Sequence, residues 1–242
     1  MVVRYEGPWA SARPLDYSSR MLLVLLACAA PHRPVATAVG ADVAPDAQGD
    51  VRRMRAAIGD PYAAAGLHFV FSVGDTRREI DWDIPHDRIA VRYTREDGVT
   101  CTVTTRVGYD GPDAEQRTAW ETFVNDQFWL LAPWKVGDAG ATVTRGEGGG
   151  VDVRYAGVGV TPGDAYHFDV DERGVVRGWT FTLASGRTGA WSWSPPTAIG
   201  PLRLSLERTS ATRTIRFEEV RVEPILLGEP NVDCPLKTPL AR

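Results

Sequence analysis

The sequence of 242 residues has little histidine and little cysteine, and this limits the chemistry that it can support. It contains four histidines and three cysteines. No two histidines have the i, i+4 spacing of a zinc-binding helix, and CxxC and HExxH do not occur. The G-x-S-x-G pattern of a nucleophile elbow is absent as well. We therefore expect no metal site, no cofactor and no enzymatic activity.

The sequence also lacks an excess of basic residues, runs of like charge and long hydrophobic runs. The formal net charge is −4 and the pI is about 5.6. Nucleic-acid binding calls for a basic patch, so we expect no nucleic-acid partner. Spanning a bilayer takes about 20 apolar residues, and the longest apolar run, Met21 to Ala27, is much shorter. We therefore expect no transmembrane helix.

The front of the chain has the features of a bacterial lipoprotein signal. Arg20 precedes the apolar run, and Leu25-Leu26-Ala27-Cys28 resembles the lipobox, which is cut before a cysteine that becomes lipid-modified. The resemblance implies a signal peptide over residues 1–27 and a lipid anchor on Cys28. Ala29 is not acidic, which favours the outer membrane, with the protein facing the periplasm. The alternative is a Leu-rich run that ends by chance in a buried cysteine.

Behind the signal we expect a flexible tether, one domain and a short tail. Residues 28–49 are rich in proline and alanine, a composition that cannot bury a core. The domain is predicted over residues 50–228, and a C-terminal tail over 229–242. Cys101 lies in a predicted strand and Cys234 in the tail. In an oxidising compartment they are a candidate disulfide, and the alternative is two separate thiols.

The stretch from Asp113 to Val136 predicts a long helix. Asp113 is suited to cap its N-terminus, and we expect Pro133 to end it. Its apolar residues have the spacing of one helical face and then surround the C-terminal end. They include Trp120, Phe123, Val124, Phe128, Trp129, Leu130, Leu131 and Trp134.

The rest of the domain alternates apolar and polar residues, which is typical of antiparallel strands. A short helix is predicted over residues 50–58, ended by Gly59. In the last strand the apolar positions change parity, which predicts a bulge near Glu218-Glu219. Too few helices are present to cover so wide a sheet, so we expect an α+β fold, mainly β, in which a strongly curved antiparallel sheet surrounds the long helix. The predicted strands are 67–73, 79–84, 89–94, 99–107, 151–155, 166–170, 175–183, 188–193, 202–208 and 214–222.

Three segments resemble motifs of an uncharacterised bacterial lipoprotein family related to the lipoprotein-sorting proteins LolA and LolB. Asn125 to Lys135 is similar to its "NDxYWLLxPYKL" signature, Gly157 to Asp164 to its "GLTPGD" turn, and Val170 to Trp179 to its "VDxxTGxVxxW" hairpin. The likeness covers roughly residues 60 to 223. It implies an incomplete β-barrel with helices in its open mouth and an apolar cavity, which holds acyl chains in the sorting proteins.

Two groups of residues are candidates for function. Asn125 and Asp126 are a polar pair in the middle of the long helix. We expect them either to bond the backbone of a neighbouring loop or to act as a polar latch that lets the helix swing away. The aromatic and apolar group either lines a ligand cavity as wall or lid, or fills the core. Its members are Trp120, Phe123, Phe128, Trp129, Leu131, Trp134 and Trp179, with Trp191 and Trp193 nearby.

The remaining ionisable residues are expected to be ordinary surface groups. His68 and His167 alternate with apolar neighbours and should lie on the wet face, as should Asp81 and Asp83. The sequence therefore favours a non-enzymatic, membrane-anchored periplasmic lipoprotein that binds or carries a lipid or other apolar molecule. The alternative is a structural or interaction lipoprotein whose interior is filled by its own side chains.

Overall fold

The computed structural model describes residues 40–156 and 163–234, and all of them belong to one compact unit, Thr37–Arg242. The predicted signal peptide, Cys28 and the first part of the tether lie outside the described residues. So do residues 157–162 of the turn motif and residues 235–242 of the tail. Among the described helices, none has the length and apolar character that crossing a membrane requires.

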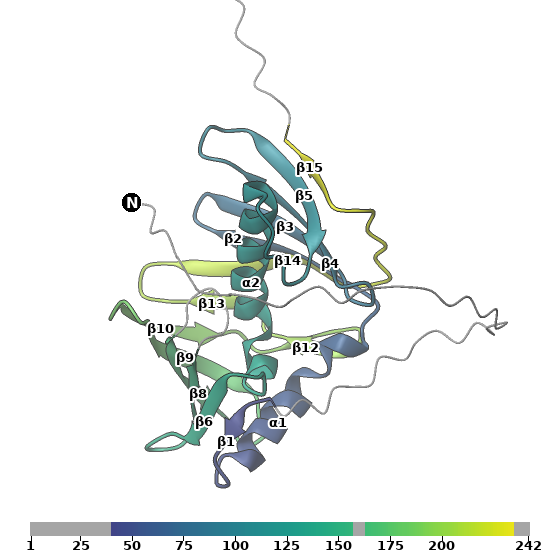
Figure 1. Cartoon of the computed structure of the whole chain (residues 1–242). Coiled ribbons are helices and arrows are strands. Elements are labelled where there is room, and N and C mark those ends of the chain that lie inside the picture. The colour runs from purple at the N-terminus through teal and green to yellow at the C-terminus, as the bar shows by residue number, and fades with distance from the viewer. Residues whose placement is uncertain (1–39, 157–162, 235–242) are drawn as a thin grey trace, which may run out of the picture. The chain divides into compact units, whose positions relative to one another are not determined.

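The described chain is mainly β and is organised around one large sheet that does not close on itself (Figure 1). Its neighbouring strands are antiparallel, except that β1 runs parallel to β6. A separate two-stranded sheet pairs β11 (Thr197–Ile199) with β12 (Leu202–Leu204). In spatial order the large sheet contains β1 (Asp42–Val43), β6 (Ala141–Arg145), β7 (Val151–Tyr155), β8 (Ala165–Val170), β9 (Val176–Thr182), β10 (Thr188–Trp193), β13 (Glu207–Thr209), β14 (Thr214–Val222), β2 (Leu67–Val73), β3 (Thr76–Asp83), β4 (Arg88–Thr94), β5 (Thr100–Arg106) and β15 (Asn231–Asp233).

Most strands occupy the predicted positions, because alternation of apolar and polar residues identifies a half-buried strand well. The predicted bulge in β14 is confirmed: its pairing with β2 shifts between Glu218 and Arg221, and Glu219 has φ 53°. The strand predicted over 202–208 is wrong as one element, since β12 and β13 belong to different sheets. No strand was predicted at the positions of β1, β6, β11 and β15.

Both predicted helices form, together with the short 3-10 helix η1 (Pro61–Ala63). Helix α1 (Gln48–Ile58) ends at Gly59, whose φ of 86° suits glycine. Helix α2 (Ala114–Lys135) begins at Asp113, whose side chain accepts a hydrogen bond from the Gln116 N–H at 2.8 Å. The prediction that Pro133 ends α2 is wrong. The helix continues to Lys135, and burial of Leu130, Leu131 and Pro133 offsets the backbone bond that the proline cannot make.

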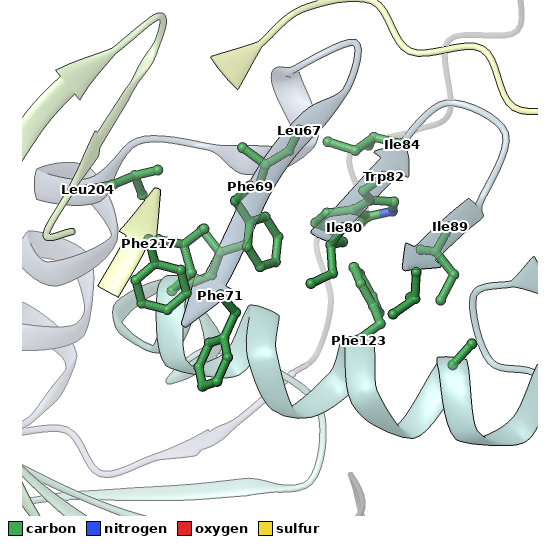
Figure 2. Close-up of a cluster of buried hydrophobic side chains, with 14 of the residues drawn as sticks. Leu67, Phe69, Phe71, Ile80, Trp82, Ile84, Ile89, Phe123, Leu204 and Phe217 are labelled. Atoms are coloured by element: carbon green, nitrogen blue, oxygen red, sulfur yellow. The ribbon is translucent and has the colours of Figure 1, made fainter. Parts of the chain in front are cut away.

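Helix α2 lies against one face of the sheet and takes part in two apolar clusters. The first contains Phe123, Leu130 and Leu131 of α2, packed against β2–β5, β14 and β12. Figure 2 shows Phe123 beside Trp82 of β3, with the ring centroids 5.2 Å apart. The second contains Ala132 of α2 together with α1 and strands β6–β10, and Phe128 and Trp129 pack against it. The helix therefore packs against two parts of the large sheet. We call β14 and β2–β5 its first arm and β6–β10 its second arm.

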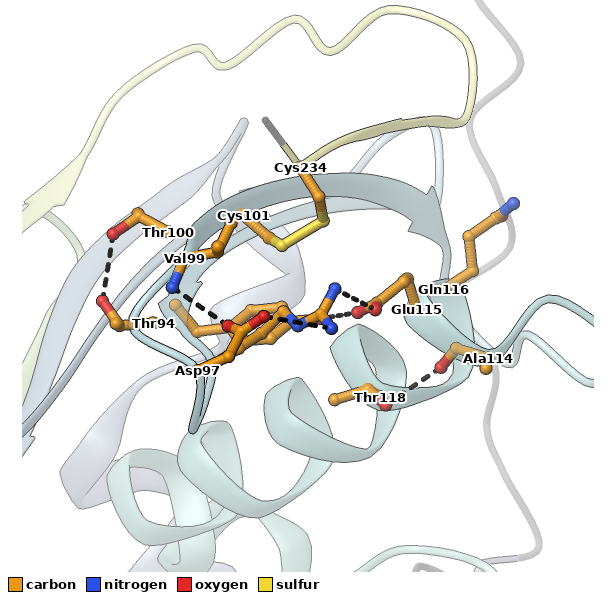
Figure 3. Close-up of a disulfide and its surroundings, with 12 residues drawn as sticks. Thr94, Asp97, Val99, Thr100, Cys101, Ala114, Glu115, Gln116, Thr118 and Cys234 are labelled. Carbon is orange, nitrogen blue, oxygen red and sulfur yellow. Dashed lines mark hydrogen bonds and ion pairs between the residues drawn. A yellow bond between two sulfur atoms is a disulfide. The ribbon is translucent and has the colours of Figure 1, made fainter. Parts of the chain in front are cut away.

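Both ends of the described chain belong to the domain. Residues 40–47 were expected in the tether, yet Asp42 and Val43 pair with β6, and Ala47 is fully buried. Residues 231–233, expected in the tail, form the edge strand β15 on β5. Cys234 and Cys101 form the disulfide that was a candidate from the sequence (Figure 3). The crosslink joins this edge strand to the sheet.

Candidate functional site

The polar pair of α2 holds the helix to strand β3. Asp126 is fully buried and accepts two hydrogen bonds from Arg78, from Nε at 2.7 Å and from Nη2 at 2.6 Å. Asn125 Nδ2 donates to the same carboxylate at 2.9 Å. The expectation that this pair bonds a loop backbone is wrong, because the partner is a side chain on the sheet. We call the Arg78–Asp126 pair the α2 latch.

The α2 latch joins a buried anion to a cation that reaches solvent. Burial raises the pKa of Asp126 to about 6, although Arg78 and Asn125 both act to lower it. The Arg78 side chain is 24% exposed, and its guanidinium lies 4.7 Å from the centre of the Phe71 ring. Arg78 also lines an open groove between the start of β3, the β4–β5 turn and the first turns of α2. Water can therefore reach the cationic side of the latch.

A layer of aromatic side chains lies between the second half of α2 and strands β7–β10. Trp129 contacts Trp179 and Trp191, with ring centroids 4.7 and 5.1 Å apart, and Phe128 stacks on Trp179 at 5.7 Å. We call this group the aromatic layer. Its members are Phe128, Trp129, Tyr155, Tyr166, Phe168, Trp179, Trp191 and Trp193.

Three polar atoms of the aromatic layer are buried and have no hydrogen-bond partner among the described residues. They are the indole N–H groups of Trp179 and Trp193 and the hydroxyl of Tyr155. Burial raises the pKa of Tyr155 and of Tyr166, so both stay neutral. Buried donors are normally paired, so unpaired donors in one layer indicate a place where water or a ligand group can bind.

The structure brings together only part of the predicted cavity group. Phe128, Trp129 and Trp179 meet in the aromatic layer. The others lie elsewhere along α2, because a helix 22 residues long presents its side chains to both arms of the sheet. Trp120, Phe123 and Leu131 belong to the first apolar cluster, and the Arg55 guanidinium of α1 covers Trp134 at 3.8 Å.

The sequence reading missed Arg208, a completely buried arginine of β13 at the edge of the aromatic layer. Its guanidinium lies 3.8 Å from the centre of the Trp193 ring and 5.2 Å from that of Phe217. Nη1 donates to the carbonyl oxygen of Ser205 at 2.5 Å and to its hydroxyl at 3.1 Å. A signal was present, since Arg208 has the same parity as Leu202 and Leu204, whose side chains are buried.

A crevice opens beside this arginine, between α1, the end of α2 and strands β9, β10 and β12. Its enclosed free space is about 30 Å³, and its volume with the mouth included is about 340 Å³. We call it the α1 crevice. It is lined mainly by apolar residues, among them Met54, Ile58, Leu130, Val176 and Trp193, and also by Arg203 and Ser205.

The histidine and aspartate residues expected on the wet face are partly buried and paired. His68 is 3% exposed and bonds Asp81 at 2.7 Å, so its prediction as a surface group is wrong. His167 bonds Asp152 at 2.6 Å. The same prediction is wrong for Asp83, which is fully buried, bonds His86 at 2.7 Å and accepts from the Leu227 N–H at 3.1 Å. These pairs hold strands and the C-terminal segment in place.

One group of potential metal ligands is formed by Cys101, Cys234 and Glu115, which lie within 4.8 Å of one another among the described residues. The disulfide between the two cysteines leaves no thiolate to bind a metal. Glu115 instead accepts hydrogen bonds from Tyr93 and from Arg95. Figure 3 shows Glu115 at the start of α2, close to the disulfide.

The described parts of the turn and hairpin motifs have structural roles. Asp164 is buried and accepts from the Ala184 N–H at 2.9 Å, which joins two loops. Asp171 accepts from the Val175 N–H at 2.9 Å and closes its own hairpin. Gly174 has φ 83°, and a Cβ there would lie 2.3 Å from the carbonyl oxygen of Arg53 in α1. Only glycine lets this hairpin approach α1 so closely.

The described geometry therefore offers two polar features in an apolar interior, the α2 latch and Arg208 with its crevice, joined by the aromatic layer. No protein-family model and no curated protein sequence matches this chain.

Proposed function

We propose that the protein is a lipid-anchored, non-enzymatic protein of the bacterial envelope that holds an apolar molecule between α2 and the sheet. The sheet is then an incomplete β-barrel similar to that of the LolA/LolB-like sorting proteins, with α2 across its open mouth. The anchor is a lipid group on Cys28. The lipobox and the three motif segments support this assignment.

The observation that carries the proposal is that aromatic rings fill the space between the second half of α2 and strands β7–β10. The backbone of α2 comes close to β4, β5 and α1, whereas it reaches β7–β10 through the rings of Phe128 and Trp129. A gap filled by side-chain rings can admit an apolar chain when those rings change rotamer. Aromatic walls with a few polar groups are typical of sites for apolar ligands.

The α2 latch supplies the element that would control entry. Asp126 is the helix residue that bonds Arg78 of β3, so this pair opposes any movement of α2 away from the first arm of the sheet. Breaking it exposes both charges to water, which lowers the cost of separating them. Opening of the latch would widen the interior on the side that faces the open groove.

A structural or interaction role is the second candidate, and one observation favours it. The rings of Phe168 and Trp179 are almost completely buried, and the free space of the α1 crevice, about 30 Å³, is far too small for an alkyl chain. An interior filled in this way needs no ligand to be stable. The two candidates differ in whether the aromatic layer can be displaced.

Tryptophan quenching by a mid-chain-brominated fatty alcohol tests the proposal, because bromine quenches only indoles that it contacts. Trp129→Phe removes a reporter from the aromatic layer, and Trp82→Phe removes a matched reporter from the first apolar cluster. We expect saturable quenching of the wild type, a smaller quenched fraction in Trp129→Phe and a larger one in Trp82→Phe.

Absence of saturable quenching, or equal quenched fractions in both variants, would refute the proposal and favour the structural role. Mass spectrometry of the protein extracted from its native envelope gives an independent check. The proposal expects a lipid to co-purify in stoichiometric amount and the mass of Cys28 to carry acyl chains.

A further inference from the structure

Arg208 is a buried cation without a counter-ion among the described residues. It is completely buried, and its hydrogen bonds go to the carbonyl and hydroxyl of Ser205, which are neutral. Desolvation lowers its pKa to about 9, so it stays charged at neutral pH. A buried charge is normally paired with an opposite charge, since burial removes its hydration. The two aromatic rings beside it compensate only in part.

The unpaired atoms of Arg208 are the ones that bind carboxylates. Nε and Nη2 have no hydrogen-bond partner in the part of the chain that the structure describes, and together they form the side edge of the guanidinium. Arg78 uses the same two atoms to hold the two oxygens of the Asp126 carboxylate. Two parallel N–H groups match the two oxygens of one carboxylate group. Within residues 40–156 and 163–234, this edge is occupied by a carboxylate in Arg78 and open in Arg208.

Arg208 lies next to a crevice that suits an apolar chain, because it contacts two of the residues that line it. Trp193 and Ser205 contact Arg208 and also line the α1 crevice. The Trp193 indole N–H is a further buried donor that finds no partner among the residues described. Most of the lining is apolar, and Arg203, which is exposed, contributes a second cation.

We infer that Arg208 is the head-group site for a single-chain amphiphile that carries a carboxylate, such as a long-chain fatty acid. This inference rests on the proposed function and specifies its ligand class. The carboxylate binds the Nε and Nη2 edge of Arg208, with the Trp193 indole as an additional donor. The alkyl chain lies in the α1 crevice and against the aromatic layer.

Entry of the head group requires a side chain to move, because the enclosed space is only about 30 Å³. Met54 of α1 lines the crevice and is fully buried. Methionine is unbranched and changes rotamer more easily than other core residues. Binding therefore rearranges α1 locally while the sheet keeps its pairing.

The test compares a brominated fatty acid with the fatty alcohol of equal chain length, using tryptophan quenching at pH 8. The purified wild-type protein should bind the acid at least tenfold more tightly than the alcohol. In Arg208→Met this preference should fall to less than twofold, while the affinity for the alcohol stays within twofold of wild type. Arg203→Met is the matched control, and it should keep at least a threefold preference for the acid.

The outcomes separate this inference from the proposed function. Saturable binding of both probes with equal affinity leaves the proposed function standing and overturns the carboxylate site. A preference that survives Arg208→Met, or one that is lost only in Arg203→Met, overturns the site as well. If neither probe binds the wild type, both proposals fail. A urea unfolding curve of each variant verifies that it is folded before its affinities are compared.

Discussion

Replacing Asp126 by asparagine should change how the stability of the protein depends on pH. The substitution keeps the shape of the side chain and one of its acceptors but removes its ionisation. Asp126 is fully buried, and burial raises its pKa from 3.8 to about 6. In the unfolded chain the carboxyl group titrates near its ordinary value.

The sign follows from which state binds the proton more tightly. The folded protein binds the Asp126 proton more tightly than the unfolded chain does. The contribution of Asp126 to the free energy of unfolding is therefore highest below pH 4, and it falls as the pH rises from 4 to 6. A difference of about two pKa units corresponds to a fall of about 3 kcal/mol, since one unit is about 1.4 kcal/mol. Above pH 6 the contribution is constant. Acid therefore favours the closed helix, and neutral pH favours opening of the α2 latch.

Urea unfolding at several pH values between 3.5 and 8 measures this contribution as the difference between wild type and Asp126→Asn. That difference should fall by about 3 kcal/mol between pH 4 and 6. A difference that rises with pH would refute the reasoning, since it would mean that Arg78 outweighs desolvation and lowers the pKa of Asp126.

Three further substitutions test other parts of the structure by urea unfolding. Arg208→Met should leave the free energy of unfolding unchanged or raise it by about 1–4 kcal/mol, because an apolar side chain replaces a buried charge that has no counter-ion among the described residues. A lower free energy of unfolding would mean that the arginine is well satisfied in the folded protein. Gly174→Ala should lower the free energy of unfolding more than Gly186→Ala does. Both glycines have a positive φ, which destabilises an alanine by roughly 1–2 kcal/mol, but only at position 174 does the new Cβ clash with α1. Equal losses would contradict that contact. Cys234→Ser should cost about 2–5 kcal/mol, because it opens a crosslink between residues 133 apart. Reduced wild type should then match the variant, and a stability that reduction does not change would contradict this.

Much of the secondary structure followed from local patterns. The end of α1 at Gly59, the cap of α2 at Asp113 and the bulge near Glu219 are each decided by residues close in sequence. Strand β6 was missed because its five residues include one large apolar side chain, Val143, which is too little to show a period. The effect of Pro133 was misjudged because the cost of a missing hydrogen bond is local, whereas the burial that offsets it comes from the rest of the fold.

The candidate site depended on tertiary structure for a different reason. Alternation gives the face on which a strand residue lies, and in the observed strands β3 and β13 both Arg78 and Arg208 point towards the apolar side. It could not tell what each would meet there. Arg78 faces Asp126, 48 residues later in the chain, whereas Arg208 faces aromatic rings and a neutral serine.

The sequence by itself therefore determined most of the strands, the two main helices and the position of the polar pair in α2, because these depend on periodicity and on near neighbours. The tertiary structure alone decided that Asp126 is paired with an arginine and that Arg208 has no carboxylate partner among the described residues, because the partner of a buried charge is set by long-range packing.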